Sequence, residues 1–153
     1  MNRVPADSIV VDANILLCAV LGRRTRQTLL EVAERRSVVT SERAADEVRA
    51  VARSMSARLA TASAVAREVL EEIDVWPASE YRGEMDMAEI TLRRAVASRD
   101  ANVRDAHILA LAWRLEADIW SHDRDFAGTG WPSWSSANLL AQLIAFDLAD
   151  RQG

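Results

Sequence analysis

The sequence predicts a three-layer α/β/α fold, with a small parallel sheet of four to five strands flanked by helices. Short runs of β-branched residues alternate with longer segments that have helical spacing. Strands that alternate with helices are joined by right-handed crossovers, which place the helices on the faces of a parallel sheet. No repeat, low-complexity segment or linker divides the 153 residues, so we expect one domain, 1–153, with its core at about 8–145.

Four strands are expected from the apolar runs. The run SIVV at 8–11 ends abruptly at Asp12 and is typical of a strand covered on both faces. The others are SVVT at 37–40, DVW closed by Pro77, and DIWS at 118–121. Gly22 is the expected stop between the first two helices. The expected helices span 13–22, 25–36, 41–54, 56–73, 79–98, 103–116 and 135–149.

Composition limits the classes of function. Half of the residues are hydrophobic and 27% are charged, as in an ordinary globular protein. There is no apolar stretch of membrane-spanning length, and the segment at 1–17 lacks the basic region followed by an apolar region that a signal peptide needs. The one cysteine, Cys18, is interpreted as a packed helix residue. We therefore expect a cytoplasmic protein without a membrane partner. The net charge of -4 gives no overall attraction for nucleic acid, so RNA would need a local basic patch or bound cations.

The absence of lysine excludes more classes of function than the overall composition does. All 19 basic residues are arginine. Schiff-base enzymes, P-loop NTPases, phosphoacceptor receiver domains and phosphatases of the haloacid dehalogenase type each need a lysine at the reacting centre. These classes are therefore excluded.

Four acids lie at positions where chemistry is expected. Asp12 directly follows the first strand and Asp123 follows the fourth, and ligands of open parallel sheets bind outside the carboxyl ends of the strands. Glu47 lies at the edge of the apolar stripe of its helix, whereas Glu42 and Asp46 lie on the charged face. The alternative for Glu47 is a boundary residue that reaches water.

Asp105 lies near the start of a later helix, on the side expected to face the sheet. With Asn102 as N-cap, it would alternatively stand at the third helical position and satisfy first-turn amides. The expected topology brings Asp12, Glu47, Asp105 and Asp123 to one edge of the sheet. Clustered carboxylates repel one another unless cations are bound, and hard divalent cations need several oxygen ligands. We therefore hypothesise a cation site.

The segments IVVDANILL, TSERAADEV, RDAHILALA and IWSHDRDF resemble the four acidic motifs of the PIN-domain nucleases, in order and at similar spacing. The resemblance is strongest to the VapC-type toxins of bacterial toxin–antitoxin pairs. It implies that Asp12, Glu47, Asp105 and Asp123 are catalytic residues and ligands of Mg²⁺ or Mn²⁺. It also implies three supporting residues: Asn14, Ser121 and the auxiliary acid Asp125.

The activity implied by the resemblance is metal-dependent hydrolysis of RNA phosphodiester bonds by an activated water. An antitoxin protein as partner and dimerisation through helices are implied as well. Positive potential for RNA would come from arginines near the acids: Arg23, Arg24, Arg26, Arg104 and Arg124. A solvated turn is the alternative for 23–26. Trp131 and Trp134 could stack on bases, but we favour packing of their loop, and we interpret His107 and His122 as structural or solvent-facing.

Three alternatives stay open from the sequence. The chain could be a degenerate PIN module that binds RNA or a protein partner without cleaving. It could be another magnesium-dependent phosphotransfer enzyme, such as a topoisomerase–primase-like domain with Asp123 and Asp125 as its paired aspartates, although Asp12 stands where that domain has a glutamate. Finally, the acids could be caps and turns of a structural protein, which predicts no stabilisation by cations.

Overall fold

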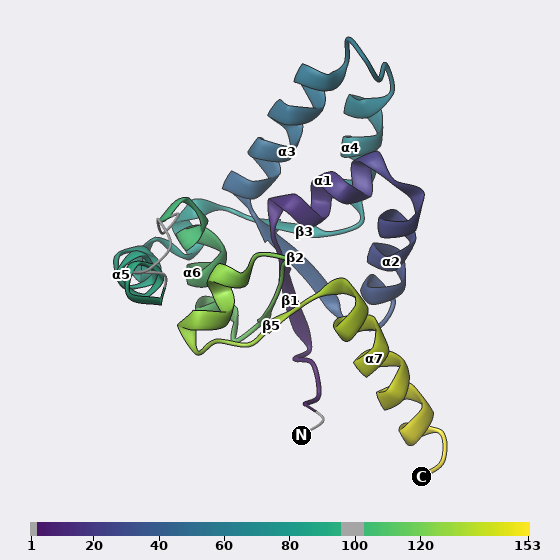
Figure 1. The fold of residues 1–153 in the computed structure, drawn as a ribbon, viewed down its shortest axis with the longest axis vertical. Helices are drawn as coiled ribbons and strands as arrows, with labels where there is room; N and C mark the ends of the chain where they lie inside the picture. The colour runs from purple at the N-terminus through teal and green to yellow at the C-terminus, as the bar shows by residue number, and fades with distance from the viewer. Residues whose placement is uncertain (1–2, 96–102) are drawn as a thin grey trace.

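The computed structural model describes residues 3–95 and 103–153. In these ranges one parallel sheet is formed by β1 (Ser8–Val11), β2 (Ser37–Ser41), β3 (Asp74–Trp76), β4 (Asp118–Trp120) and β5 (Ser133–Trp134). Helices lie on both faces of this sheet (Figure 1). The three-layer α/β/α architecture expected from the sequence is therefore confirmed.

The order of the strands places β1 at the centre of the sheet. The order is β3-β2-β1-β4-β5, and Val10 of β1 pairs in register with Val39 of β2 and Ile119 of β4. The chain moves outward from β1 to β3 and then returns to the other side of β1 for β4 and β5. The strand order thus reverses between β1 and β4, which is where open α/β sheets bind their ligands.

The helices follow the strands in the expected order. The segments between β1 and β3 hold α1 to α4, α5 and α6 join β3 to β4, and α7 ends the chain. The helix bounds are α1 (Ala13–Leu21), α2 (Arg23–Ala33), α3 (Glu42–Met55), α4 (Ala62–Glu71), α5 (Met85–Ala95), α6 (Ala106–Leu115) and α7 (Ser136–Asp150). Short 3₁₀ turns are η1 (Ala78–Glu80), η2 (Arg82–Glu84), η3 (Val103–Asp105) and η4 (Arg124–Thr129).

Local sequence signals explain where the helices next to the site begin. Asp12 is the N-cap of α1, and its side chain accepts a hydrogen bond from the amide of Ile15. Ser41 caps α3 in the same way, by accepting from the amide of Ala44 at 3.0 Å. Asp12 directly follows the last residue of β1, and Ser41 is the last residue of β2, so strand ends and helix starts meet at one edge of the sheet.

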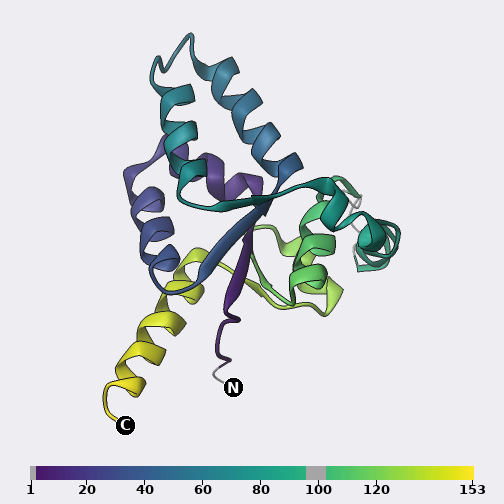
Figure 2. The same ribbon diagram turned by 180° about the vertical axis from the view of Figure 1, so that it is seen from behind.

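The hairpin of α3 and α4 projects at one end of the molecule, and the first described residues and the C-terminus lie at the opposite end (Figures 1 and 2). The strands run towards the α3–α4 end. Helix α6 packs against β1, β2, β4 and α5, and all its residues from 106 to 112 are buried. No helix in the described ranges has the length and apolar character needed to cross a bilayer.

Four details differ from the expectations. Helix α5 begins at Met85 instead of residue 79, because η1 and η2 precede it. Helix α4 begins at Ala62 instead of 56, since hydrogen-bonded turns reverse the chain after α3. Strand β5 has two residues, too few for a periodic pattern. Cys18 is exposed instead of packed, because it lies on the side of α1 opposite the buried Ala19 and Val20.

Candidate active site

The four acids line one cavity of about 150 Å³ at the carboxyl ends of β1 and β4, which we call the acid cavity. Asp12 and Asp123 reach it from the ends of these strands, Glu47 from α3, and Asp105 from the residue before α6. Asn14, in the first turn of α1, lines it as well. The structure therefore brings together residues that are up to 111 positions apart in sequence.

Asp12 is the most firmly held of the four acids. It is 6% exposed, its Oδ1 accepts from the amide of Ile15 at 3.0 Å, and its Oδ2 accepts from the hydroxyl of Ser121. Burial raises the pKa of Asp12; the hydrogen bonds from Ser121 and Ile15 oppose this rise, and the charge of Asp123 adds to it. A cation in the cavity would favour the ionised carboxylate.

Ser121 links the two strand-end acids. Its buried hydroxyl donates to Asp12 and accepts from the backbone amide of Asp123 at 2.9 Å. The main chain adds a further connection, since the amide of Asp12 donates to the carbonyl of Trp120 at 3.1 Å. This geometry suits the supporting role that the resemblance implied for Ser121.

Glu47 differs from the other acids at the start of α3. Glu42 accepts from the amide of Ala78 at 2.9 Å, and Asp46 pairs with Arg49 at 3.0 Å. Of these three acids, Glu47 alone lines the acid cavity, and its side chain is exposed. The choice of Glu47 from its position on the helix thus agrees with the arrangement of the described residues.

Asp105 does not occupy the helical position that the capping alternative expected for it. It stands at the N-cap of α6 instead of the third helical position, and it makes no side-chain capping hydrogen bond with the described residues of that helix. Asn102, the cap expected from the sequence, lies outside the described residues. The side chain of Asp125 also lies outside them; its backbone belongs to η4.

The acid cavity offers the ligand chemistry of a hard divalent cation. Four carboxylates open onto it, and oxygen ligands of this kind bind Mg²⁺ and Mn²⁺. Within the described residues, no three histidine, cysteine, aspartate or glutamate side chains stand close enough together to hold a metal ion as they are. Binding an ion would require a side-chain movement, for which the exposed Glu47 is suited.

His107 is a titratable residue of the acid cavity that sequence reasoning did not assign to the site. It is 3% exposed, and its Nδ1 lies 2.6 Å from the hydroxyl of Ser41. Burial, aided by the charge of Arg43, lowers the pKa of His107 to about 4, so the ring is neutral at pH 7. The structure confirms a buried, hydrogen-bonded histidine. The feature of the sequence that could have indicated a place for His107 in the cavity is its position two residues after Asp105.

The candidate RNA contacts fall into two groups. Arg26 donates from Nε to the carbonyl of Ala19 and from Nη2 to that of Val20, at 3.1 Å each. It therefore stabilises the end of α1, and we leave it out of the RNA-binding residues. The other four arginines are exposed: Arg23, Arg24, Arg104 and Arg124.

The tryptophans of the C-terminal loop pack into the fold, as favoured from the sequence. The indole of Trp131 donates to the carbonyl of Ala117 at 2.7 Å, and that of Trp134 donates to Asp118 at 2.8 Å. Both rings contact the hydrophobic core. His122 is exposed, with Nε2 2.9 Å from the hydroxyl of Ser136.

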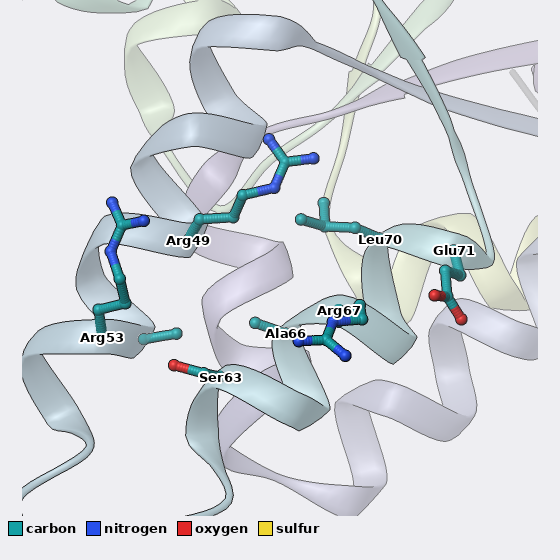
Figure 3. Close-up of a pocket in the computed structure, with 8 residues that line it drawn as sticks. Arg49, Arg53, Ser63, Ala66, Arg67, Leu70 and Glu71 are labelled. Carbon is teal, nitrogen blue, oxygen red and sulfur yellow. The ribbon is translucent and has the colours of Figure 1, made fainter.

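A second, larger hollow of about 440 Å³ lies between α3 and α4. Arg49 and Arg53 of α3 and Arg67 and Leu70 of α4 line it (Figure 3). None of the four acids lines this hollow. Its size alone does not make it the candidate active site, because Glu71 is the one carboxylate among the residues that line it.

Comparisons with known proteins place the chain in a family. The sequence matches the PIN domain over residues 10–144. The fold is similar to that of VapBC2 from Rickettsia felis bound to a DNA fragment from their promoter, with a TM-score of 0.65 and 13% identity over 84% of this chain and 98% of that chain. It is also similar to PAE2754 from Pyrobaculum aerophilum, with a TM-score of 0.62 and 19% identity over 90% of each chain. A search of curated proteins gives no significant match. Because residues 10–144 make up most of the sequence, the chain belongs to the PIN domain family.

Proposed function

We propose that the protein is a cytoplasmic endoribonuclease that hydrolyses RNA phosphodiester bonds with Mg²⁺ or Mn²⁺. PIN domains are generally nucleases. The observation that supports the proposal most directly is that Asp12, Glu47, Asp105 and Asp123 line one cavity at the point where the strand order reverses. In the proposal these four carboxylates hold the cation.

The residues around the acid cavity suit hydrolysis by water. A bound cation would lower the pKa of a water molecule and stabilise charge on the phosphate. Asp12 is kept in one orientation by Ser121 and the amide of Ile15. Among the described residues that line the cavity there is no serine, threonine, cysteine or lysine, so no side chain there resembles the usual covalent nucleophiles.

The substrate and the partner belong to the same proposal. Exposed arginines would hold the phosphates of single-stranded or looped RNA: Arg23, Arg24, Arg104 and Arg124. We propose a VapC-like toxin role with an antitoxin protein as partner, which is supported by the fold similarity to VapBC2 from Rickettsia felis. Membership of the PIN family removes the reason to consider a topoisomerase–primase-like domain.

A second candidate is a PIN module that binds RNA or a protein without cleaving it. The observation that favours it is that no three metal-binding side chains among the described residues are positioned to hold an ion as they stand. The two candidates differ in whether a cation binds at the acids.

The deciding experiment combines thermal melts with RNA cleavage. We expect Mn²⁺ and Mg²⁺ to raise the Tm saturably and to support cleavage of labelled single-stranded RNA, with EDTA abolishing both effects. Asp105→Asn should remove the rise in Tm and the cleavage while leaving the metal-free protein as stable as before or slightly more so, because one like charge is lost. Glu68→Gln, an exposed acid of α4, is the matched control and should change neither.

The results separate the two candidates. RNA binding with no cation effect on either Tm or cleavage would favour the binding module. An Asp105→Asn protein that fails to fold would instead assign Asp105 a structural role.

A further inference from the structure

A second cavity lies beside the acid cavity, and the two meet at His107. It has a volume of about 300 Å³ and lies among the first turn of α3, the turns η1 and η2, and the start of α5. His107 lines both cavities. An RNA strand with a phosphate at the acids therefore has this second hollow next to it.

Two arginines at the second cavity are available for a ligand. Arg43 and Arg82 are exposed, and neither guanidinium forms a hydrogen bond or ion pair with another described residue. The two acids of the same cavity already have partners: Glu42 accepts from the amide of Ala78, and Asp46 is ion-paired within α3. Arg49 offsets the charge of Asp46, so the two arginines outnumber the one remaining carboxylate, Glu42, and the lining is net positive in a chain whose net charge is -4.

The remaining lining is suited to an unpaired base. Met85 is half-buried and Tyr81 is 2% exposed, so the cavity has an apolar and aromatic wall. Nδ1 of His107 faces Ser41, and no hydrogen bond from the described residues reaches its Nε2. Unpaired bases of RNA are commonly held against rings and apolar surfaces while their edges form hydrogen bonds.

We propose that the second cavity binds the nucleotide next to the scissile phosphate, with Arg43 and Arg82 on its phosphates and its base beside Met85 and His107. This inference rests on the proposed function, because it assumes that the acid cavity cuts RNA. It adds a site that selects which base lies next to the cut.

The dimensions favour a nucleotide over an acidic peptide segment. A hollow of about 300 Å³ is at the small end of the range for ligand pockets and accepts one base with its sugar, whereas a docked helix needs an extended groove. Planar guanidinium groups match phosphate oxygens in pairs. The shared residue His107 also places this site at the position that a continuing RNA strand would occupy.

The first test measures binding without cleavage. The four nucleoside 5′-monophosphates are titrated separately into the ¹⁵N-labelled full chain in EDTA, where the acid cavity repels phosphate because it lacks a cation. We expect saturable binding of at least one of them, with shifts of the side-chain signals of Arg43, Arg82 and His107. Arg43→Gln combined with Arg82→Gln should weaken this binding about tenfold or more.

Arg67→Gln is the matched control, because Arg67 also lines a hollow but lies between α3 and α4. It should leave nucleotide binding unchanged, and the Tm of all variants should stay the same because the side chains are exposed. The inference is wrong if none of the four nucleotides binds, if inorganic phosphate binds as tightly as they do, or if an acidic peptide binds at these residues and the nucleotides do not.

Cleavage kinetics form the second test. In the double arginine variant, KM for single-stranded RNA should rise about tenfold with little change in kcat, and the preference for the base beside the cut should weaken. The slope of log affinity against log salt should fall by about 1.4, for two phosphate contacts on a single strand. Unchanged KM and base preference would overturn the inference.

The two tests also separate this inference from the proposed function. If the wild-type protein cleaves no RNA but the double variant loses nucleotide binding, the proposed function fails while the nucleotide site stands. If the wild type cleaves and the double variant behaves like it in both tests, only the nucleotide site fails.

Discussion

Ser121 shows how one side chain organises the acid cavity. Its hydroxyl donates to the carboxylate of Asp12 and accepts from the amide of Asp123, so it holds the ends of β1 and β4 in a fixed relation. It also satisfies one oxygen of a carboxylate that is 6% exposed. Groups that orient metal ligands in this way affect metal affinity without touching the metal.

Replacing Ser121 should therefore weaken metal binding. We expect Ser121→Ala to lower the affinity for Mn²⁺ by about 10- to 100-fold, because Asp12 loses the hydroxyl that orients it. Ser121→Thr keeps the hydroxyl and should retain the affinity. Calorimetric titration with Mn²⁺ measures both variants, and equal losses in the two would show that packing, and not the hydrogen bond, is what matters.

His107 should make stability depend on pH. Its pKa is lowered to about 4 in the folded protein, whereas an unfolded histidine titrates near 6.5. The unfolded chain therefore binds the proton more readily, and folding stability should fall as the pH drops from 6.5 to 4, by about 3 kcal/mol from this residue. Stability above pH 6.5 is not affected by it.

Urea unfolding of the metal-free protein across this pH range tests the expectation. His107→Gln keeps a hydrogen-bonding group facing Ser41 but does not titrate, so its stability should depend less steeply on pH below 6.5. Asp12, whose raised pKa acts in the opposite direction, is present in both proteins, so the difference between them isolates His107. Parallel pH profiles would contradict the assignment.

Among the secondary-structure elements, the two ends of α1 have different roles, one in the acid cavity and one in the stability of the fold. Its start is capped by Asp12, which belongs to the acid cavity. Its end is held by Arg26, whose guanidinium donates to the carbonyls of Ala19 and Val20. Cationic groups stabilise the carbonyl end of a helix, so this arginine stabilises the fold. The sequence alone did not indicate this role, because Arg26 lies close to Arg23 and Arg24 and was grouped with them.

Arg26 and Arg23 should therefore separate stability from RNA binding. We expect Arg26→Gln to cost about 1 kcal/mol, with a fall in Tm of about 2–4 °C, and to leave RNA affinity unchanged. Arg23→Gln should do the reverse, because Arg23 is exposed. Thermal melts and RNA titrations on both variants check this, and a loss of RNA affinity in Arg26→Gln alone would return Arg26 to the RNA-binding group.

For the molecule as a whole, the carboxyl ends and the amino ends of the strands have different roles. The carboxyl edge holds the acid cavity, whereas Asp118 stands at the start of β4, at the other edge, and is 3% exposed. It accepts from the amide of Ala6 at 3.0 Å and from the indole of Trp134, and it pairs with Arg3 at 3.4 Å. This buried acid thus joins the N-terminal segment to β5.

Asp118→Ala should consequently destabilise the fold without changing the chemistry. We expect a loss of about 2–4 kcal/mol, because the buried donors that contact it lose their acceptor. The folded variant should still show the rise in Tm with Mn²⁺. Asp7→Ala, an exposed neighbour, is the control for stability. A variant that keeps its stability but loses the Mn²⁺ effect would place Asp118 in the active site.

The sequence was sufficient for the first four strands, the helix order and the acids at strand ends, but not for the two-residue β5. The β-branched run at 8–11 stops at a polar residue, as is typical of a strand covered on both faces, and the carboxyl ends of strands in a parallel sheet share one edge. Asp12 and Asp123 were identified on this basis alone. Glu47 followed from its angle on α3, which is a local property of the helix.

The three-dimensional arrangement was needed wherever the outcome depends on which elements pack together. Right-handed crossovers do not say to which side of β1 the chain returns, so the position of β4 beside β1 had to be seen in the structure. The same holds for Arg26 at the end of α1 and for His107 between two cavities. These roles are set by partners distant in sequence or by the folded path of the chain, and no local pattern of residues encodes them.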